Sequence, residues 1–141
     1  MPLVGNIKKV LWRLITPHWG DIRDFLLWTG VIWHEPGRQR YPIGWLKPGK
    51  DRTSFREYMR NANGFDDHFI AWVDDGEDFG LRRIDRGVYQ YHLRLFRDGE
   101  IRGHYEITPE EDLYRHFWEV GMEPRREEFL KFLGDWVVQK D

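Results

Sequence analysis

The chain has 141 residues, of which 33% are charged, 40% hydrophobic and 16% aromatic. This length suits one compact domain, so we expect a single globular domain over residues 1–141. Its 8 tryptophans argue against intrinsic disorder, because disordered chains are poor in aromatic residues. The absence of cysteine excludes disulfides, thiolate metal ligands and a cysteine nucleophile, and it is typical of a reducing compartment.

Neither apolar segment of the chain is typical of an exported or membrane-spanning protein. Residues 1–15 mix apolar residues with lysine and arginine and lack the continuous apolar core of a signal peptide. Residues 25–33 form the longest apolar stretch, but Thr29 and Gly30 interrupt it, and it is far shorter than the roughly 20 residues of a membrane span. We therefore expect a cytoplasmic protein that has no membrane partner.

The charge is distributed unevenly along the chain, although the net charge is only −2. Residues 1–60 hold 11 Lys/Arg and 5 Asp/Glu, whereas residues 61–141 hold 11 Lys/Arg and 19 Asp/Glu. Such asymmetry can mark a polyanion-binding surface at the basic end. The alternative, which we favour for a chain of this length, is that the two halves fold together and neutralise each other.

The first 50 residues contain signals for two helices followed by turns. Apolar residues recur at helical spacing over residues 7–14, and Pro17 prevents this helix from continuing. Residues 21–28 can form a second helix, with Gly30 placed to end it. Over residues 31–50, Pro-Gly and Tyr-Pro pairs indicate turns around short extended pieces.

A third helix and two strands are expected next. The helix begins at Ser54, where Ser-Phe-Arg-Glu matches the capping box, in which the Ser54 hydroxyl and the Glu57 carboxylate each accept from a free N–H group. It ends near residues 63–64, which are Asn-Gly. The strands lie at residues 69–73 and 79–84, with an acidic turn between them.

The clearest pattern is a β-hairpin over residues 89–107, in which apolar and polar residues alternate. A two-residue turn would pair Leu93 with His104 and set apolar side chains against polar ones. A three-residue loop with a left-handed Gly99 keeps each face consistent, so we choose that register. The inner pairs that it predicts are Leu95–Ile101, Leu93–Gly103 and Tyr91–Tyr105. The outer pairs are Arg94–Arg102, His92–His104 and Gln90–Glu106.

Two helices close the chain. Thr108 caps the first, Pro109 takes its first position, and Gly121 ends it. Pro124 opens the second helix, whose apolar residues are Phe129, Phe132, Leu133 and Trp136. The whole pattern predicts an α+β fold. It consists of an antiparallel meander of about four strands, roughly residues 68–107, with N-terminal helices and two C-terminal helices packed on one face.

No catalytic or metal-binding motif is intact. Residues 44–50 fit the glycine-lysine pattern of a phosphate loop, but Pro48 lacks an N–H group, and Asp51 stands where a hydroxyl should bind magnesium. The single serine lies in a helix cap rather than in a nucleophile elbow. The histidines do not form a His-Glu-x-x-His pattern, and residues 74–78 lack the spacing of a calcium loop. We therefore assign no metal and no cofactor.

Residues 38–60 combine positive charge with aromatic rings, because they hold 7 Lys/Arg against 2 Asp/Glu and four aromatic residues. Cations for phosphates and rings for bases are what binding of single-stranded nucleic acid requires. Against this interpretation, aromatic residues usually form the core and arginines keep a surface solvated. The candidate nucleic-acid-binding residues are Arg38, Arg40, Trp45, Lys50, Arg52 and Arg56.

The outer face of the predicted hairpin gathers polar residues that can bind an anion. Arg94 and Arg102 repel each other unless an anion, a carboxylate or water separates them. A phosphate or carboxylate ligand would relieve this repulsion, with the histidines as donors. Alternatively, the face is open to solvent, or acids from elsewhere pair with the arginines. Two histidines and a carboxylate are also a known metal set, but strand spacing alone is weak support for one. The candidate anion-binding residues are Arg94, Arg102, His92, His104 and Glu106.

These features favour a small, non-enzymatic binding or interaction module inside the cell. No nucleophile, metal signature or intact phosphate loop supports catalysis, whereas tryptophan and arginine are the residues that dominate interaction hot spots. The partner would be another protein or a second copy of the chain. Two alternatives stay open. One is nucleic-acid binding through residues 38–60, and the other is a small enzyme or anion sensor that uses the polar face of residues 89–107.

Overall fold

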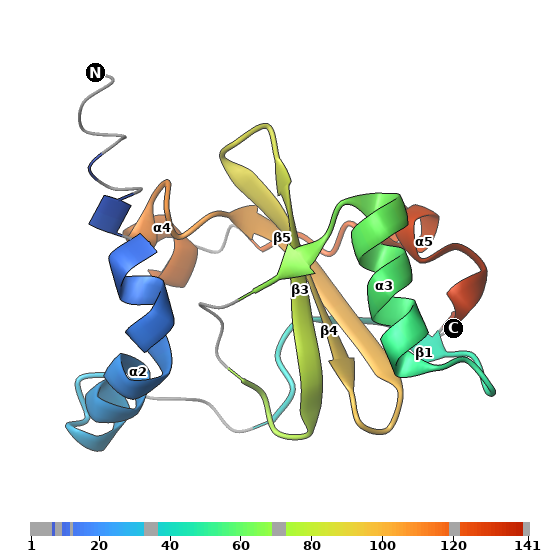
Figure 1. Cartoon of the computed structure of the whole chain (residues 1–141), viewed down its shortest axis with the longest axis horizontal. Coiled ribbons are helices and arrows are strands. Elements are labelled where there is room, and N and C mark those ends of the chain that lie inside the picture. Colours follow the sequence, from blue (N-terminus) through green and yellow to red (C-terminus); the bar gives the residue numbers. More distant parts are fainter. Residues whose placement is uncertain are drawn as a thin grey trace.

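A six-stranded antiparallel sheet forms the centre of the protein (Figure 1). The computed structural model describes residues 7, 10, 11, 13–32, 37–68, 73–118 and 122–139. The strands lie in the order β2-β3-β4-β5-β1-β6. Their bounds are β1 (Tyr41–Leu46), β2 (Asp66–Asp67), β3 (Glu77–Asp85), β4 (Tyr89–Phe96), β5 (Glu100–Ile107) and β6 (Val137–Gln139).

The predicted α+β class is confirmed, but the expected count of about four strands is wrong. The meander β3-β4-β5 was predicted, whereas β1 and β6 extend the sheet beyond β5, and the two-residue β2 lies at its other edge. Of these three strands, β2 has two residues and β6 has three, and β1 and β6 pair with strands that are distant in the chain. Of the strand expected at residues 69–73, residues 69–72 lie outside the described part of the chain.

The helices lie on both sides of the sheet, not on one face as predicted. Figure 1 shows α3 (Arg52–Asn63) and α5 (Arg126–Leu133) on one side, and α2 (Trp19–Trp28) and α4 (Leu113–Trp118) on the other. Among the residues whose burial the structure describes, the helical apolar residues buried in the core belong to α3 and α5, and α2 has no buried residue. No helix among the described residues has the length and apolar character that a bilayer crossing requires.

The N-terminal helices match their predictions closely. The described residues between 7 and 15 are helical, and a 3-10 turn at Thr16–His18 follows where Pro17 was expected to end the helix. Helix α2 ends at Trp28, and Gly30 then takes a left-handed φ of 73°. This conformation is accessible to glycine at little cost and ends the helix where the sequence predicts.

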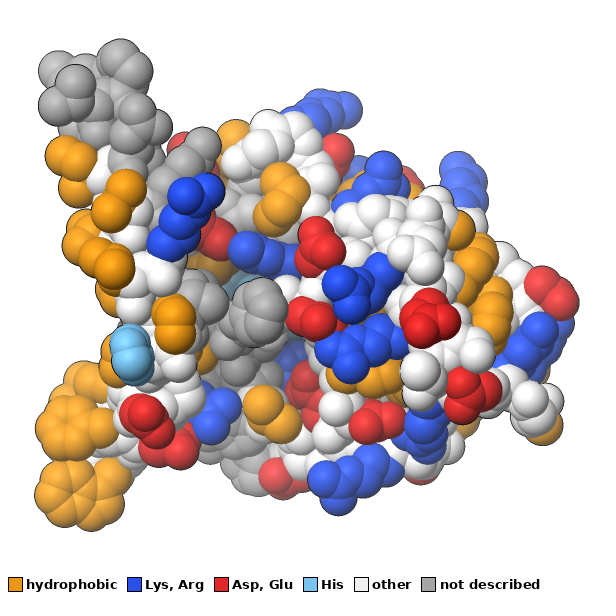
Figure 2. Space-filling model, viewed as in Figure 1, with side chains coloured by type: hydrophobic (Ala, Val, Ile, Leu, Met, Phe, Trp, Pro, Cys, Tyr) orange, Lys and Arg blue, Asp and Glu red, His pale blue; other side chains and the backbone are white. Residues whose placement is uncertain are grey.

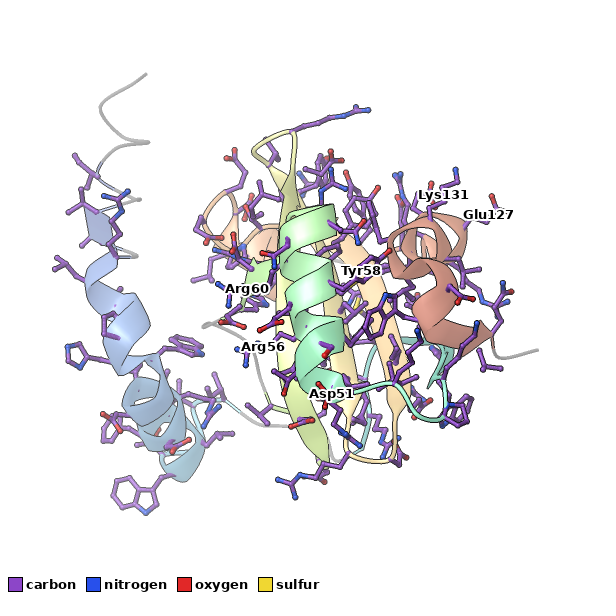
Figure 3. All side chains as sticks on the ribbon, turned by 45° about the vertical axis from the view of Figure 1, so that its right-hand side comes forward. Asp51, Arg56, Tyr58, Arg60, Glu127 and Lys131 are labelled. Atoms are coloured by element: carbon purple, nitrogen blue, oxygen red, sulfur yellow. The ribbon has the colours of Figure 1, made fainter. Side chains whose placement is uncertain are left out.

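Helix α3 is capped by Asp51, so the prediction of Ser54 as the cap is wrong. The Asp51 carboxylate accepts hydrogen bonds from the Ser54 backbone N–H at 2.8 Å and from the Ser54 hydroxyl at 2.9 Å. An ionised carboxylate is favoured there because the helix N-terminus carries partial positive charge. Figure 3 shows Asp51 at this end of α3 and Tyr58 directed towards α5. The helix ends as predicted, with Gly64 in a left-handed conformation (φ 68°).

The last two helices begin later than predicted. The Thr108 hydroxyl accepts from the Glu111 N–H at 3.3 Å, but this closes only a turn, and α4 starts after Asp112, whose carboxylate accepts from the Arg115 N–H at 3.0 Å. The predicted end at Gly121 lies outside the described residues. Helix α5 starts after Pro124 and buries Phe129 and Leu133, while Phe132 and Trp136 are partly buried against the core.

The register predicted for the β4-β5 hairpin is confirmed in full. Gly99 is left-handed, with φ 91°, and it closes the three-residue loop. The pairs are Leu95–Ile101, Arg94–Arg102, Leu93–Gly103, His92–His104, Tyr91–Tyr105 and Gln90–Glu106. One face of the two strands is therefore apolar, and the other carries the polar residues.

The apolar face forms the hydrophobic core with α3 and α5. Phe55 and Met59 from α3 and Phe129 and Leu133 from α5 are completely buried against it. Gly103 on β5 faces α5, and the Phe129 ring of α5 fills the space that a side chain at this position would take. A β-carbon at Gly103 would lie 2.8 Å from Phe129 Cζ and 2.9 Å from Ile43 Cδ1. Because these are neighbouring rings and branched chains in a closed core, they have little room to move.

Replacing Gly103 by alanine therefore tests the packing of α5 on the sheet. We expect Gly103→Ala to lower the free energy of unfolding by about 1–3 kcal/mol, the usual cost of overpacking, as measured by urea denaturation. Gly20→Ala is the control, because a β-carbon at Gly20 meets nothing within 4 Å. It should leave stability unchanged or raise it by at most about 1 kcal/mol. A Gly103→Ala variant as stable as the wild type would contradict this packing.

Candidate functional site

The polar face of the β4-β5 hairpin is buried, so the alternative of a face open to solvent is wrong. His92, Arg94 and His104 have an exposed fraction of 0%, and Glu106 one of 7%. The backbone before β1 covers part of this face, because Arg102 Nη1 donates to the carbonyl oxygens of Arg38 (3.1 Å) and Arg40 (3.0 Å). Antiparallel sheets commonly leave one face in water, and this sheet departs from that pattern.

Both opposed arginines have carboxylate partners, and those of Arg94 come from outside the hairpin, which was one of the predicted alternatives. Arg94 Nη1 contacts Glu77 and lies 3.3 Å from Asp74. Arg102 Nε donates to Glu100 at 3.0 Å. The repulsion between the two guanidinium groups is therefore relieved within the fold, and it no longer argues by itself for a bound anion.

Beside these ion pairs, His92, His104 and Glu106 converge on one point. One ligand atom from each residue lies within 4.8 Å of the other two. Glu106 Oε1 is 2.7 Å from His104 Nε2 and 3.7 Å from His92 Nδ1. The confirmed register causes this, because it places His92 opposite His104, and Glu106 is two residues further along the same face of β5.

The facing ring nitrogens have no hydrogen-bond partner within the described residues. His92 Nδ1 is too far from the Glu106 carboxylate, and His104 Nε2 is close to it without pointing an N–H group at it. Ligands around one transition-metal ion lie about 3 Å apart, because each lies about 2.0–2.2 Å from the metal. The separations of 2.7 and 3.7 Å lie on either side of that value. Two of the three separations are thus close to those between ligands of one ion.

A second layer of residues orients this cluster. His68 Nδ1 lies 3.0 Å from His92 Nε2, and Gln90 Nε2 donates to Glu106 Oε1 at 2.9 Å. When His92 donates from Nε2 to His68, its Nδ1 keeps a free lone pair facing the cluster. His116 Nδ1 donates to the Ile107 carbonyl at 2.9 Å and lies 3.5 Å from Glu106 Oε2.

Sequence reasoning missed His68 and His116. No regular spacing links them to the hairpin, because His68 follows the two-residue β2 and His116 comes from α4. Their only common feature in the sequence is that they flank the hairpin on either side. The backbone N–H of His68 donates to the Gly80 carbonyl at 3.3 Å, which brings this residue onto the sheet. This long-range pairing has no local signal.

Burial fixes the protonation states in the cluster. It lowers the pKa of His68 and of His92 well below the usual value and, helped by the nearby charge of Arg40, lowers the pKa of His104 to about 4. Burial opposes ionisation of Glu106, but the nearby histidines, His104 first, outweigh it and hold the pKa of Glu106 well below its usual value. At neutral pH the imidazoles are neutral and the carboxylate is ionised, which are the forms that bind metals.

The candidate nucleic-acid-binding residues do not form a free basic surface, because most of them have partners in the fold. Arg38 pairs with Asp98 at 2.7 Å, Arg52 with Asp78 at 2.8 Å, and Arg56 with Asp67. These pairs join the basic half of the chain to the acidic half, which supports neutralisation on folding. The other three are Arg40, which is half-buried with its Nε atom shielded from solvent, Lys50, whose Nζ lies 4.7 Å from the centre of the Trp136 ring, and Trp45, which is 38% exposed.

The histidine cluster makes stability depend on pH. As pH falls below about 6.5, the unfolded chain takes up protons at its histidines, whereas folded His104 does so only near pH 4. The free energy of unfolding should therefore fall between pH 6.5 and 4, by about 3 kcal/mol for His104 alone. Urea denaturation at several pH values should show a shallower dependence for His104→Gln. The exposed His18, changed to Gln, is the control; an equal dependence in wild type and His104→Gln would contradict this assignment.

Taken together, the cluster offers two neutral ring nitrogens and one ionised carboxylate oxygen among buried polar residues. This donor set can hold a metal ion and leave further coordination positions for another ligand. Comparison of the chain with protein-family models, with curated proteins and with solved structures finds no match.

Proposed function

We propose that this protein binds one divalent transition-metal ion through His92 Nδ1, His104 Nε2 and Glu106 Oε1. The observation that carries the proposal is the convergence of these three buried atoms, of which both ring nitrogens have no hydrogen-bond partner among the described residues. The proposal departs from the sequence analysis, which assigned no metal, because strand spacing alone did not show that the face is buried or that the atoms meet.

A metal ion accounts for a cost that the polar cluster otherwise carries. A buried polar atom without a partner destabilises the fold by about 1–3 kcal/mol, and native proteins contain few of them. Imidazole nitrogens with one carboxylate suit zinc, iron, cobalt or nickel in their divalent states. Hydrogen bonds from residues outside the ligand set, such as those of His68 and Gln90 here, are typical of metal sites and hold the ligands in orientation.

The site has the composition of a reactive rather than a structural metal site. Structural zinc sites have four protein ligands, whereas sites that bind a further molecule have three and keep a position open. Among the described residues, the cluster supplies three ligands within mutual reach. We therefore favour a metal centre that takes up a small ligand over one that only stabilises the fold.

Metal titration of the chelator-treated protein tests this function. We expect one equivalent of Co²⁺ or Zn²⁺ to bind by calorimetry and to raise the thermal midpoint, because a ligand that binds only the folded state stabilises it. His92→Ala, His104→Ala and Glu106→Gln should each weaken binding by about 100-fold or more, since each removes a ligand. His68→Ala should weaken it less, by about 10- to 100-fold, as expected for a residue that orients a ligand.

The matched control is His18→Ala, which removes an exposed histidine far along the chain from the hairpin. It should bind the metal as the wild type does. One-equivalent binding that survives in all three ligand variants would place the metal elsewhere and rule out the proposal. So would the absence of binding at neutral pH, where the imidazoles are neutral.

A second candidate function is self-association through the N-terminal helical segment, which comprises the described residues 7, 10, 11 and 13–31. Its apolar side chains lie largely in solvent: Leu14 is 65% exposed, Phe25 59% and Trp28 82%. Figure 2 shows hydrophobic side chains gathered along the outer side of this segment, away from the sheet. Monomeric proteins seldom expose such a continuous apolar surface, and the segment supports the interaction role expected from the composition. It carries both arginine and aspartate, so an antiparallel second copy can pair opposite charges.

Sedimentation velocity tests the second candidate. The wild type should sediment as a dimer at concentrations of about 10–100 μM, and Phe25→Ser with Trp28→Ser should sediment as a monomer, because the largest apolar contacts are lost. Ile84→Ser is the control, since Ile84 is 46% exposed on β3, outside the segment. A wild type that stays monomeric at these concentrations would contradict self-association.

A further inference from the structure

Arg94 keeps one edge of its guanidinium group without a partner. Its Nη1 atom takes both carboxylate contacts, whereas Nε and Nη2 have no hydrogen-bond partner among the described residues, although Arg94 is completely buried. Nε and Nη2 donate in parallel from the same side, which is the geometry that holds two oxygens of a carboxylate or a phosphate. Arg56 uses the same two atoms to hold Asp67 in this protein. Nε and Nη2 of Arg94 can therefore hold an oxyanion in the same way.

Arg40 adds a second cation to the same place. Its Nε is buried and has no hydrogen-bond partner within the described residues. Its backbone is left-handed, with φ 74°, and its carbonyl oxygen accepts from Arg102 Nη1 at 3.0 Å. Burial first, and then the neighbouring positive charge of Arg94, lower the pKa of Arg40 to about 10. Two guanidinium groups thus lie near each other in a buried region, and each has an N–H donor without a partner among the described residues.

These donors lie beside the histidine cluster. Arg94 is two residues from His92 on the same face of β4, so their α-carbons are about 7 Å apart. Gly80 on β3, which has no side chain, lies next to both the Glu77 carboxylate and the His92 ring. A β-carbon there would lie 3.0 Å from Glu77 Oε1, whose carboxylate pairs with Arg94, and 3.5 Å from His92 Nε2. The arginine pair and the proposed metal ligands therefore border one polar region.

The charge of this region also favours an anion once a metal is bound. Three buried or half-buried carboxylates, those of Asp74, Glu77 and Glu106, face the two guanidinium groups and leave one negative charge. A divalent ion at the cluster changes this to one positive charge. One monovalent anion then makes the region neutral, which is the state that a low-dielectric interior favours.

We infer that the ligand of the proposed metal centre is a small carboxylate, bound with one oxygen at the open coordination position and held by Arg94 Nε and Nη2 and by Arg40. This inference rests on the proposed metal-binding function. A carboxylate spans about 6 Å from a metal to a guanidinium nitrogen, which fits the spacing of His92 and Arg94 along β4. Arg102, the other arginine predicted to bind an anion, does not contact the carboxylate. Its Nε and Nη1 atoms already donate to Glu100 and to two backbone carbonyls.

The test uses the full chain loaded with Co²⁺, whose visible absorption reports a change of its ligands. Acetate at about millimolar concentration should change the absorption of the wild type until it saturates, whereas chloride at equal ionic strength should not. Arg94→Lys keeps the positive charge but loses the paired donors, and Arg40→Met loses the second cation. Each should bind Co²⁺ and need at least about 10-fold more acetate. Arg83→Met is the control, since Arg83 lies over the Phe132 ring outside the cluster.

The outcomes separate this inference from the function on which it rests. If Co²⁺ does not bind, both proposals are wrong. If Co²⁺ binds and acetate leaves the absorption unchanged, only the carboxylate inference is wrong. An acetate effect of equal strength in both arginine variants would also overturn it, because the anion would then bind the metal without them. A response to phosphate but not to acetate would overturn the assignment to carboxylates. Arg40→Met serves as the test if Arg94→Lys fails to fold.

Discussion

The three-residue loop between β4 and β5 determines which side chains meet in this molecule. Gly99 has a φ of 91°, a conformation that residues with a side chain rarely adopt, and the loop that it closes sets Leu93 opposite Gly103 and His92 opposite His104. A shift of one residue would move every side chain of one strand to the other face. The apolar core and the buried histidine cluster are therefore two results of one register.

The two faces of this hairpin are both buried, but they differ in what burial does to stability. On the apolar face, packing of α3 and α5 removes hydrocarbon surface from water, which stabilises the fold by about 25 cal/mol per Å². On the polar face, burial is favourable only where each group finds a partner. Arg94 Nη1 finds two carboxylates, whereas its other edge and the facing nitrogens of His92 and His104 find none among the described residues. A ligand that completes these groups would account for them, and this is the basis of the proposed metal site.

The parts of the fold that follow local rules could be predicted from the sequence, and the parts that depend on distant pairing could not. Alternation and one glycine gave the hairpin register, and Asn63-Gly64 gave the end of α3. The three-residue β6 has no pattern of its own and exists because β1 offers it an edge. Within the site, the hairpin residues were predicted to share a face, but their burial was not. That burial comes from Asp74, His68 and the backbone before β1. No pattern in the sequence indicates that these residues contact the hairpin.

Charge also sets an order for binding at the proposed site. In the metal-free protein the region carries one excess negative charge, so a second anion entering it would be repelled and would lose its hydration without compensation. A divalent cation meets neutral imidazoles and an ionised Glu106, because burial keeps His92 and His104 unprotonated. Its binding reverses the sign of the excess charge and so creates the attraction that a carboxylate needs. Arg94 Nε and Nη2, which have no partner among the described residues, would then orient the carboxylate through two hydrogen bonds, whereas charge alone would not fix its orientation.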